Sequence, residues 1–425
     1  MLLPALAACS FVRDLDDLPG ESHASMSCPT LAPPGIVQTD LTGSAAPFQV
    51  PQNYLGMHVS PADPDTGAPI SAPQYAYGYL RNLKVGSGSK GVERGFWQNI
   101  EIAETPEGQS GVYEWTHIDK WLEANPDHPV IWVIYGTPTF YQKYADQNDD
   151  YWGGNLPRGM HNPPADEKHY ALKRYAQAVK TRYGARIAAF EVWDAPTLSY
   201  GDAGNYSKRC DPSITDTNEC PEQRRFSGNA SDLANIAYTL NQAGLDTPIL
   251  GAGFVDQWEA EQYSVTRFLN APVTLPGGSG TGKDHVQALS IQFFDYAFTP
   301  ADLIVHIDGY RAKLDSAGIG NLPLWLTASG AAGTGSFLAG DSRAPTHIKR
   351  WAMIGAAKRL QSYVLYAHAE PGSAIPSLGD PVNDAAVQAA IADSYNLGGK
   401  TICDARLLSD GRVWLVTREG GASLE

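Results

Sequence analysis

Residues able to take part in acid–base chemistry lie at the ends of several apolar segments of this sequence. Glu191 and Asp194 belong to the segment FEVWDAP, residues 190–196, and His58 ends the first apolar run. Glu191 precedes Asp194 by three positions, and strand alternation would place the two side chains on opposite faces. We therefore interpret Glu191 as a structural residue and Asp194 as a candidate site residue.

Eight apolar runs, separated by longer amphipathic stretches, predict the elements that position these residues. Uninterrupted apolar runs are typical of parallel strands that are covered on both faces. Their eightfold alternation with helical patterns predicts an α/β fold, a (β/α)8 TIM barrel. An open doubly wound sheet is the alternative, but no glycine fingerprint opens its first helix. The predicted strands are residues 54–59, 77–83, 130–135, 187–193, 248–252, 286–292, 324–327 and 363–367.

The ends of the fourth and seventh runs resemble those of the four-seven superfamily (clan A) of retaining glycoside hydrolases. Many members carry Trp-Asn-Glu-Pro after strand four and Thr-Glu-x-Gly after strand seven. This sequence has WDAP at 193–196 and TASG at 327–330. Ala195 therefore occupies the acid/base position and Ala328 the nucleophile position. Over about residues 50–420 the chain looks most like family 39 and relatives encoded in bacterial exopolysaccharide operons, biofilm hydrolases among them.

The resemblance implies a retaining endo-glycoside hydrolase of a bacterial exopolysaccharide that needs neither cofactor nor metal. Such an enzyme uses one carboxylic acid to protonate the leaving oxygen and one carboxylate to attack the anomeric carbon. Alanine can do neither, so we predict that this chain is inactive. Deliberate replacement of two glutamates is one explanation and a natural glycan-binding pseudoenzyme is another; the otherwise intact motifs favour replacement. A hydrolase of plant or host glycans is a further alternative.

The resemblance also implies a set of substrate-binding positions. Arg81 corresponds to the strand-two arginine that supports the nucleophile, and with Ala328 in place we expect it to lack a carboxylate partner and to bind water or an anion. Asp194 stands where relatives carry an asparagine that binds the sugar 2-hydroxyl. Gln292 falls near a histidine of relatives, and Tyr296 is the candidate for a tyrosine that orients the nucleophile. The residues predicted to bind substrate are His58, Arg81, Trp97, Trp193, Asp194, Gln292, Tyr296 and His368. A surface arginine and a core histidine are the alternatives for Arg81 and His58.

The cysteines predict an exported protein. The sequence LAAC at 6–9 matches a bacterial lipoprotein cleavage box in which Cys9 would be acylated; a chance alanine-rich start is the alternative. Cys210 and Cys220 flank a short polar segment that a disulfide would close. Cys28 and Cys403 would then join the N-terminal arm to the C-terminal segment. Four free thiols in a cytosolic protein are the other possibility.

The length and composition of the chain limit the number of domains and the kinds of partner that we expect. The chain has 425 residues, 43% of them hydrophobic, and a net charge of −15, which disfavours nucleic acid as a partner. We predict a signal remnant at 1–9, an N-terminal tether at 10–50, the barrel at 51–375, and a helix with a small β-rich appendage at 376–425. The expected protein is a monomer that binds a polysaccharide or oligosaccharide. It would be a periplasmic or outer-membrane-associated lipoprotein of a Gram-negative bacterium, with a lipid anchor.

Overall fold

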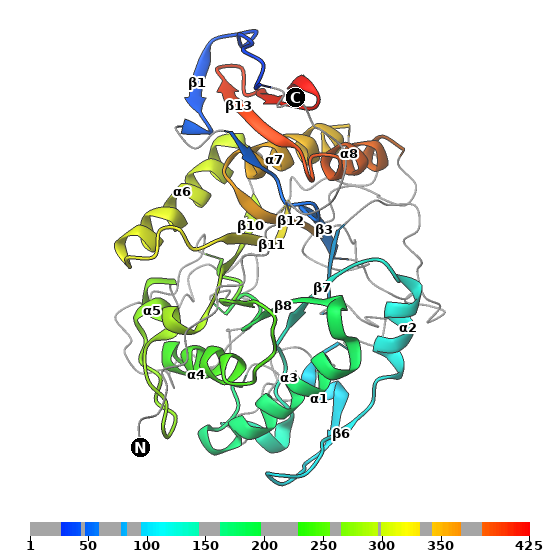
Figure 1. Cartoon of the computed structure of the whole chain (residues 1–425), viewed down its shortest axis with the longest axis vertical. Helices are drawn as coiled ribbons and strands as arrows, with labels where there is room; N and C mark the ends of the chain where they lie inside the picture. Colours follow the sequence, from blue (N-terminus) through cyan, green and yellow to red (C-terminus); the bar gives the residue numbers. More distant parts are fainter. Residues whose placement is uncertain are drawn as a thin grey trace, which may run out of the picture.

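The computed structural model of the chain is shown in Figure 1. The structure describes residues 27–43, 47–58, 78–82, 95–143, 162–196, 228–255, 265–295, 299–331, 342–366 and 385–425. None of the helices in these ranges combines the length and the hydrophobicity of a membrane-spanning segment.

Eight parallel strands form the central sheet, in the order β10-β11-β12-β3-β4-β7-β8-β9. Backbone hydrogen bonds also join the two ends of this order: Gly251 N–H donates to Ala288 O at 2.9 Å, and Phe254 N–H donates to Ser290 O at 3.2 Å. The sheet therefore closes, and the predicted (β/α)8 barrel is confirmed. The strands in chain order are β3 (Leu55–His58), β4 (Tyr79–Arg81), β7 (Val130–Val133), β8 (Ile187–Glu191), β9 (Ile249–Leu250), β10 (Leu289–Asp295), β11 (Leu324–Ala331) and β12 (Leu360–Tyr366).

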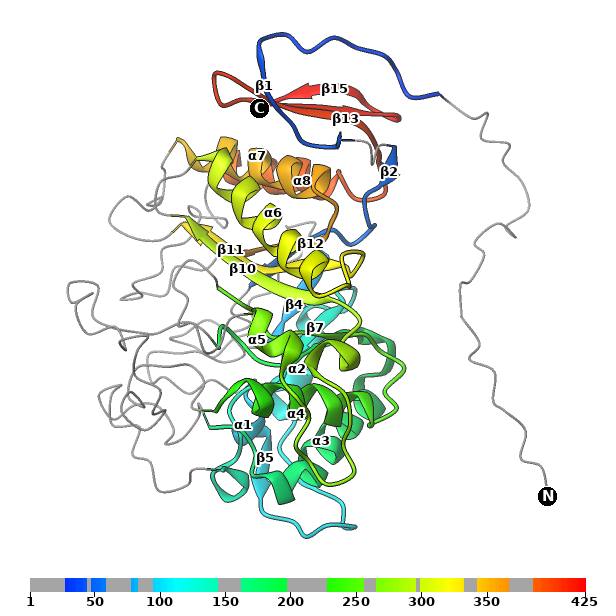
Figure 2. The same ribbon diagram turned by 90° about the vertical axis from the view of Figure 1, so that its left-hand side faces the viewer.

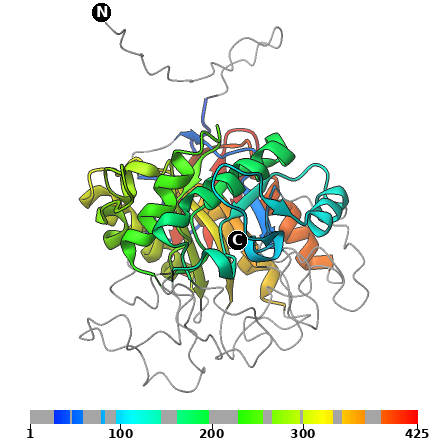
Figure 3. The ribbon, with the colours of Figure 1, turned by 90° about the horizontal axis from the view of Figure 1, so that it is seen from below.

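Helices surround the strands, as the view from below shows (Figure 3). Helix α3 is followed by Gly184, whose φ of 56° is easily adopted by glycine, and α4 begins with a capping box between Asn229 and Asp232. Both helices lie between predicted strands, where the amphipathic stretches were expected. The helices are α1 (Trp97–Ile100), α2 (Thr116–Ala124), α3 (His169–Tyr183), α4 (Ala230–Asn241), α5 (Val265–Asn270), α6 (Pro300–Ser316), α7 (Ala344–Ala357) and α8 (Ala385–Tyr395). A short hairpin, β5 (Glu101–Ala103) and β6 (Val112–Tyr113), follows α1.

The barrel interior is filled by side chains in the manner of this fold. Its apolar part contains Ile131, Ala189, Leu250, Ala288 and Val364. The larger hydrophobic cluster lies between the strands and the helices, where side chains such as Trp132, Tyr175 and Trp351 are fully buried. This packing leaves the carboxyl ends of the strands as the rigid platform for a site.

A second, antiparallel sheet covers one side of the barrel. Its strands are β1 (Val37–Asp40), β2 (Phe48–Gln49), β13 (Thr401–Leu408), β14 (Val413–Thr417) and β15 (Gly421–Leu424). It lies over α7 (Figure 2). The predicted helix and β-rich C-terminal appendage are confirmed. The prediction of a tether for residues 10–50 is wrong for β1 and β2, because both strands pair with β13. Their polar composition hid short strands that need a partner from the other end of the chain.

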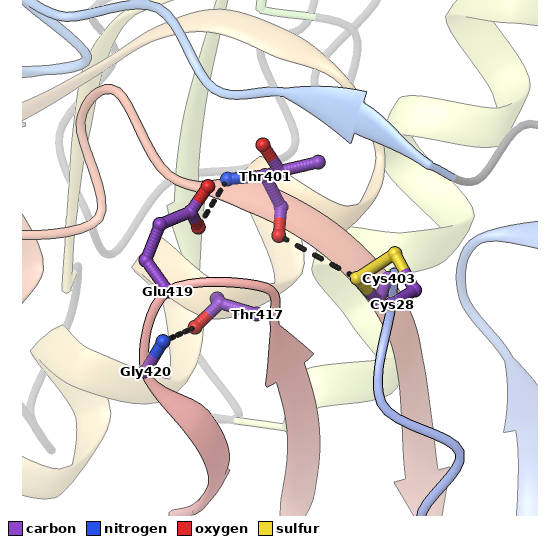
Figure 4. The surroundings of a disulfide bond; sticks show 6 residues. All are labelled: Cys28, Thr401, Cys403, Thr417, Glu419 and Gly420. Atoms are coloured by element: carbon purple, nitrogen blue, oxygen red, sulfur yellow. Dashed lines mark hydrogen bonds between the residues drawn. A yellow bond between two sulfur atoms is a disulfide. The ribbon is translucent and has the colours of Figure 1, made fainter. Parts of the chain in front are cut away.

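A disulfide joins Cys28 to Cys403 in β13, as predicted (Figure 4). The bond links residues separated by 375 positions and fixes the N-terminal arm to the appendage. Cys9, Cys210 and Cys220 lie outside the described residues, so their predicted roles stay predictions.

Candidate active site

Ala195 follows the fourth barrel strand at a sharp change of backbone direction. Strand β8 ends at Glu191, and the chain continues beside the fifth strand, where Gly253 N–H donates to Trp193 O at 2.9 Å. Ala195 then has a φ of 43°, in the left-handed region that costs a non-glycine residue about 1 kcal/mol. The surrounding barrel holds this residue in a conformation that it would not adopt by itself.

Ala328 lies in the seventh strand at a shift in register. Between Leu326 and Ala328, β11 carries one residue more than β10, and Ala328 is the partner of Gln292. The pairing of β11 with β12 shifts in the same segment. An extra residue of this kind interrupts the alternation of side chains along a strand. The hydroxyl of Thr327 points into the barrel towards Glu191. Because of the extra residue, the side chain of Ala328 need not point to the opposite face from that of Thr327.

Six polar side chains from strands two, four, six and seven form one hydrogen-bonded cluster, which we call the polar cluster. Its members are Arg81, Glu191, Asp194, Ser290, Gln292 and Thr327. All six are buried, Asp194 with 4% of its surface exposed. Burying a polar group is costly unless it is hydrogen-bonded, and the members of this cluster bond to one another across four strands.

Arg81 pairs with two carboxylates. Its Nη2 lies 2.6 Å from Glu191 Oε2 and 3.0 Å from Asp194 Oδ1, and its Nε lies 3.1 Å from Glu191 Oε2. Burial lowers the pKa of Arg81, but the two carboxylates raise it above its ordinary value. The expectation that Arg81 would lack a carboxylate partner is wrong. The prediction that Glu191 and Asp194 face opposite ways is also wrong, because β8 ends at Glu191 and the chain leaves strand geometry before Asp194.

Glu191 forms hydrogen bonds with side chains from three other strands inside the barrel. Ser290 donates to its Oε1 at 2.6 Å and Thr327 donates to the same oxygen at 2.9 Å. Burial raises the pKa of Glu191 above its ordinary value, and Arg81 acts in the opposite direction. The carboxyl group thus contacts strands two, six and seven, in keeping with its interpretation as a structural residue.

Gln292 connects the two alanine positions. Its Nε2 donates to Asp194 Oδ1 at 2.7 Å, and its backbone pairs with Ala328. Asp194 directly precedes Ala195. The structure thus brings together three of the predicted site residues, Arg81, Asp194 and Gln292, at the carboxyl ends of strands where sites of this fold lie.

The two predicted tryptophans have different environments. Trp193 is buried beside Tyr135, with ring centroids 5.1 Å apart, at the ends of strands four and three. Trp97 instead stacks on Tyr175 of α3 at 5.3 Å, and its indole N–H donates to Glu101 Oε2 at 2.7 Å. Trp97 thus packs in the helix layer, and its role in substrate binding stays a prediction.

The structure does not describe the side chains of three residues that were predicted to bind substrate. Tyr296 and His368 lie outside the described residues. His58 ends β3, but its side chain is not among those described. Their roles in substrate binding stay predictions.

Ser290 is a member of the polar cluster that the sequence reasoning missed. The available signal was its spacing from Gln292, because two polar residues two positions apart in an otherwise apolar strand share one face. Within the described ranges, no group of three or more His, Cys, Asp or Glu side chains is placed to hold a metal ion.

Comparison with known proteins supports the fold. The sequence matches no protein-family model. No curated protein matches it significantly. A GH39 β-xylosidase from Caulobacter crescentus superposes with a TM-score of 0.51 and 14% identity, over 88% of this chain and 79% of that one. A GH39 enzyme from Xanthomonas axonopodis pv. citri gives 0.51 and 15%, over 87% and 73%.

A glucosidase from Croceicoccus marinus gives a TM-score of 0.50 and 12% identity, over 87% of this chain and 76% of that one. At these identities the likeness defines the architecture of the chain. It is a (β/α)8 barrel with an added β-sheet.

Proposed function

We propose that this chain is a retaining glycoside hydrolase in a form without its two reacting carboxylates, which binds a glycan and does not cleave it. The observation that carries the proposal is the contact between Gln292 and Asp194 at 2.7 Å. It connects the strand-four end that carries Ala195 with the strand partner of Ala328. The barrel neighbours that are named as a β-xylosidase and a glucosidase support the choice of glycosidic bonds as the target.

The proposal gives the site residues separate tasks. A retaining hydrolase needs its two carboxyl groups about 5–5.5 Å apart, which side chains from strand ends of one barrel can supply. In a form with both glutamates, the one at position 195 would protonate the leaving oxygen and the one at position 328 would attack the anomeric carbon. Arg81 and Gln292 hold Asp194 Oδ1 in place. Asp194, as a carboxylate, accepts hydrogen bonds from sugar hydroxyls.

The finer proposal concerns substrate and location. We assign the chain to endo-acting hydrolases of a bacterial exopolysaccharide, exported as a lipid-anchored monomer to the periplasm or outer membrane of a Gram-negative bacterium. The lipobox-like LAAC sequence at 6–9 and the disulfide between Cys28 and Cys403 support export. Plant or host glycans are the alternative substrates.

A natural glycan-binding pseudoenzyme is the second candidate. One observation favours it: Arg81 has Glu191 and Asp194 as partners, so this buried cation is neutralised without a carboxylate at position 328. In a natural pseudoenzyme, the polar cluster needs no further carboxylate. If two glutamates were deliberately replaced, the site should still accept a glutamate at position 328.

Restoring both glutamates tests the proposal. We expect the double variant Ala195→Glu/Ala328→Glu to hydrolyse the glycan that the original chain binds, with retention of anomeric configuration. Each single variant should be slower by about 10²-fold or more, because loss of the general acid alone costs about 10²–10⁴-fold. The matched control is Ala195→Gln/Ala328→Gln, which has the same side-chain size without the carboxylates. Binding without any restored hydrolysis would favour the pseudoenzyme.

A further inference from the structure

Two side chains beside the third barrel strand carry buried polar atoms that have no hydrogen-bond partner. They are Gln98 in α1 and Thr137, which follows β7. Among the described residues, both amide atoms of Gln98 and the hydroxyl of Thr137 are buried and unpaired. Thr137 is fully buried, and its carbonyl oxygen already accepts a hydrogen bond of 2.7 Å from Gln142 Nε2. The hydroxyl is therefore the group of Thr137 that lacks a hydrogen bond.

The backbone places these two residues next to each other. Gln98 N–H donates to Gly136 O at 2.7 Å, and Thr137 directly follows Gly136. Both therefore lie at the carboxyl end of strand three, in the region where sites of this fold are built.

The same region adjoins the acid/base position. Ile134 N–H donates to Glu191 O at 2.8 Å, so strands three and four still pair at this level. The rings of Tyr135 and Trp193 then lie 5.1 Å apart. Trp193 is two residues before Ala195. The rings of Tyr135 and Trp193 therefore lie between the end of strand three, with Gln98 and Thr137, and the acid/base position.

Unpaired buried groups of this kind are unfavourable. An unsatisfied buried donor or acceptor costs about 1–3 kcal/mol, and a native structure contains few of them. A ligand that supplies the missing hydrogen bonds removes this cost when it binds. Gln98 offers an acceptor and a two-proton donor side by side, and Thr137 offers a hydroxyl that can donate or accept.

We propose that Gln98 and Thr137 form a subsite for two adjacent hydroxyl groups of a neutral sugar residue, next to the acid/base position. One hydroxyl would donate to Gln98 Oε1, and its neighbour would accept from Gln98 Nε2, with Thr137 as a further partner. Neither residue carries a charge, so the chemistry fits a neutral sugar better than an acidic or amino sugar. The inference rests on the proposed glycan-binding function and adds a chemical class of substrate to it.

Binding measurements on the full chain test the subsite. The probes are xylohexaose, cellohexaose and mannohexaose, titrated by calorimetry into the original chain and into the variants Gln98→Met and Thr137→Val. We expect each variant to bind about three- to tenfold more weakly, the effect of one or two neutral hydrogen bonds. The melting temperature should stay the same or rise, because each variant removes an unpaired buried group.

The matched control is Ser362→Ala. Ser362 carries another unpaired buried hydroxyl, but it lies within β12, where its strand partner is Trp325. This variant should bind the probes as the original chain does.

The outcomes separate the subsite from the proposed function. If the original chain binds a probe and Gln98→Met and Thr137→Val bind it equally well, the subsite is overturned and the proposed function stands. A lowered melting temperature in both variants would show structural roles and would also overturn the subsite. If the original chain binds none of the three probes, the subsite for a neutral sugar is overturned, while the proposed function is still judged by the variant that restores both glutamates.

Discussion

Thr327 donates a hydrogen bond of 2.9 Å from its hydroxyl to Glu191 Oε1, which joins strand seven to strand four through the barrel interior. Each residue stands close to one alanine position: Thr327 directly precedes Ala328, and Glu191 lies four residues before Ala195. Because Glu191 also pairs with Arg81 from strand two, one carboxyl group fixes three strands beneath the candidate site. The hydrogen bond thus links the two strand ends that carry the alanine positions.

The ion pairs of Arg81 give a stability prediction. We expect Arg81→Met to lower the free energy of unfolding by about 3–5 kcal/mol, because it leaves buried carboxylates without their cation. Urea unfolding followed by circular dichroism measures this. The control is Arg182→Met, which removes an exposed ion pair with Asp119 and should cost no more than about 1 kcal/mol. Equal losses in the two variants would contradict a central role for the polar cluster.

Gln292→Glu should make stability depend on pH in a defined direction. The new carboxyl would face Asp194 Oδ1 at the 2.7 Å position of the present hydrogen bond, so one of the two carboxyl groups would have a strongly raised pKa when folded. The folded state then holds a proton that the unfolded state releases. Relative to the original chain, the variant should therefore gain stability as the pH falls from 7 towards the ordinary carboxyl pKa of about 4.

The comparison variant is Gln292→Met, which loses the same hydrogen bond without adding a charge. Its loss of stability, measured by urea unfolding between neutral pH and pH of about 5, should change little over that range. A loss in Gln292→Glu that is equally independent of pH would show that the new carboxyl points away from Asp194.

The sequence predicts the barrel well because the apolar runs are local signals. A buried parallel strand must be apolar on both faces, and its period is visible without knowledge of its neighbours. The partners of Arg81 were not predictable in this way. Its strand, β4, is separated from β8 by β7, so the ion pair with Glu191 depends on how the sheet curves.

The register of strand seven could not be predicted from the sequence, because it also depends on neighbouring strands. The extra residue of β11 between Leu326 and Ala328 exists only relative to the neighbouring strands. Likewise, the aromatic surroundings of Trp97 come from Tyr141 and Tyr175, which are distant in the sequence. A tryptophan in a short helix gives no local signal of whether it faces a ligand or another helix.

The disulfide between Cys28 and Cys403 should stabilise the chain measurably. We expect Cys28→Ser to lower the free energy of unfolding by about 2–5 kcal/mol, because the bond closes a very long loop and restricts the unfolded chain. A substitution is preferable to a reductant, which would also act on other cysteines. Cys403→Ser should have a similar effect, and the double variant should lose no more than either single variant. Additive losses would contradict the bond.

His306 predicts how part of the stability depends on pH. Burial in α6 lowers the pKa of His306 from 6.5 to about 4, while its hydrogen bond of 3.0 Å to Gln292 O acts in the opposite direction. Below pH 6.5 the unfolded chain therefore binds a proton that the folded chain excludes. Stability falls as the pH decreases from 6.5 to about 4 and levels off below that.

At 1.36 kcal/mol per pKa unit, this one residue contributes a loss of about 3 kcal/mol over the range. His306→Gln keeps a donor for the Gln292 carbonyl and does not titrate, so its urea midpoint should decline less between neutral pH and pH of about 4. A pH dependence in His306→Gln as steep as that of the original chain would show that His306 is protonated in the folded state.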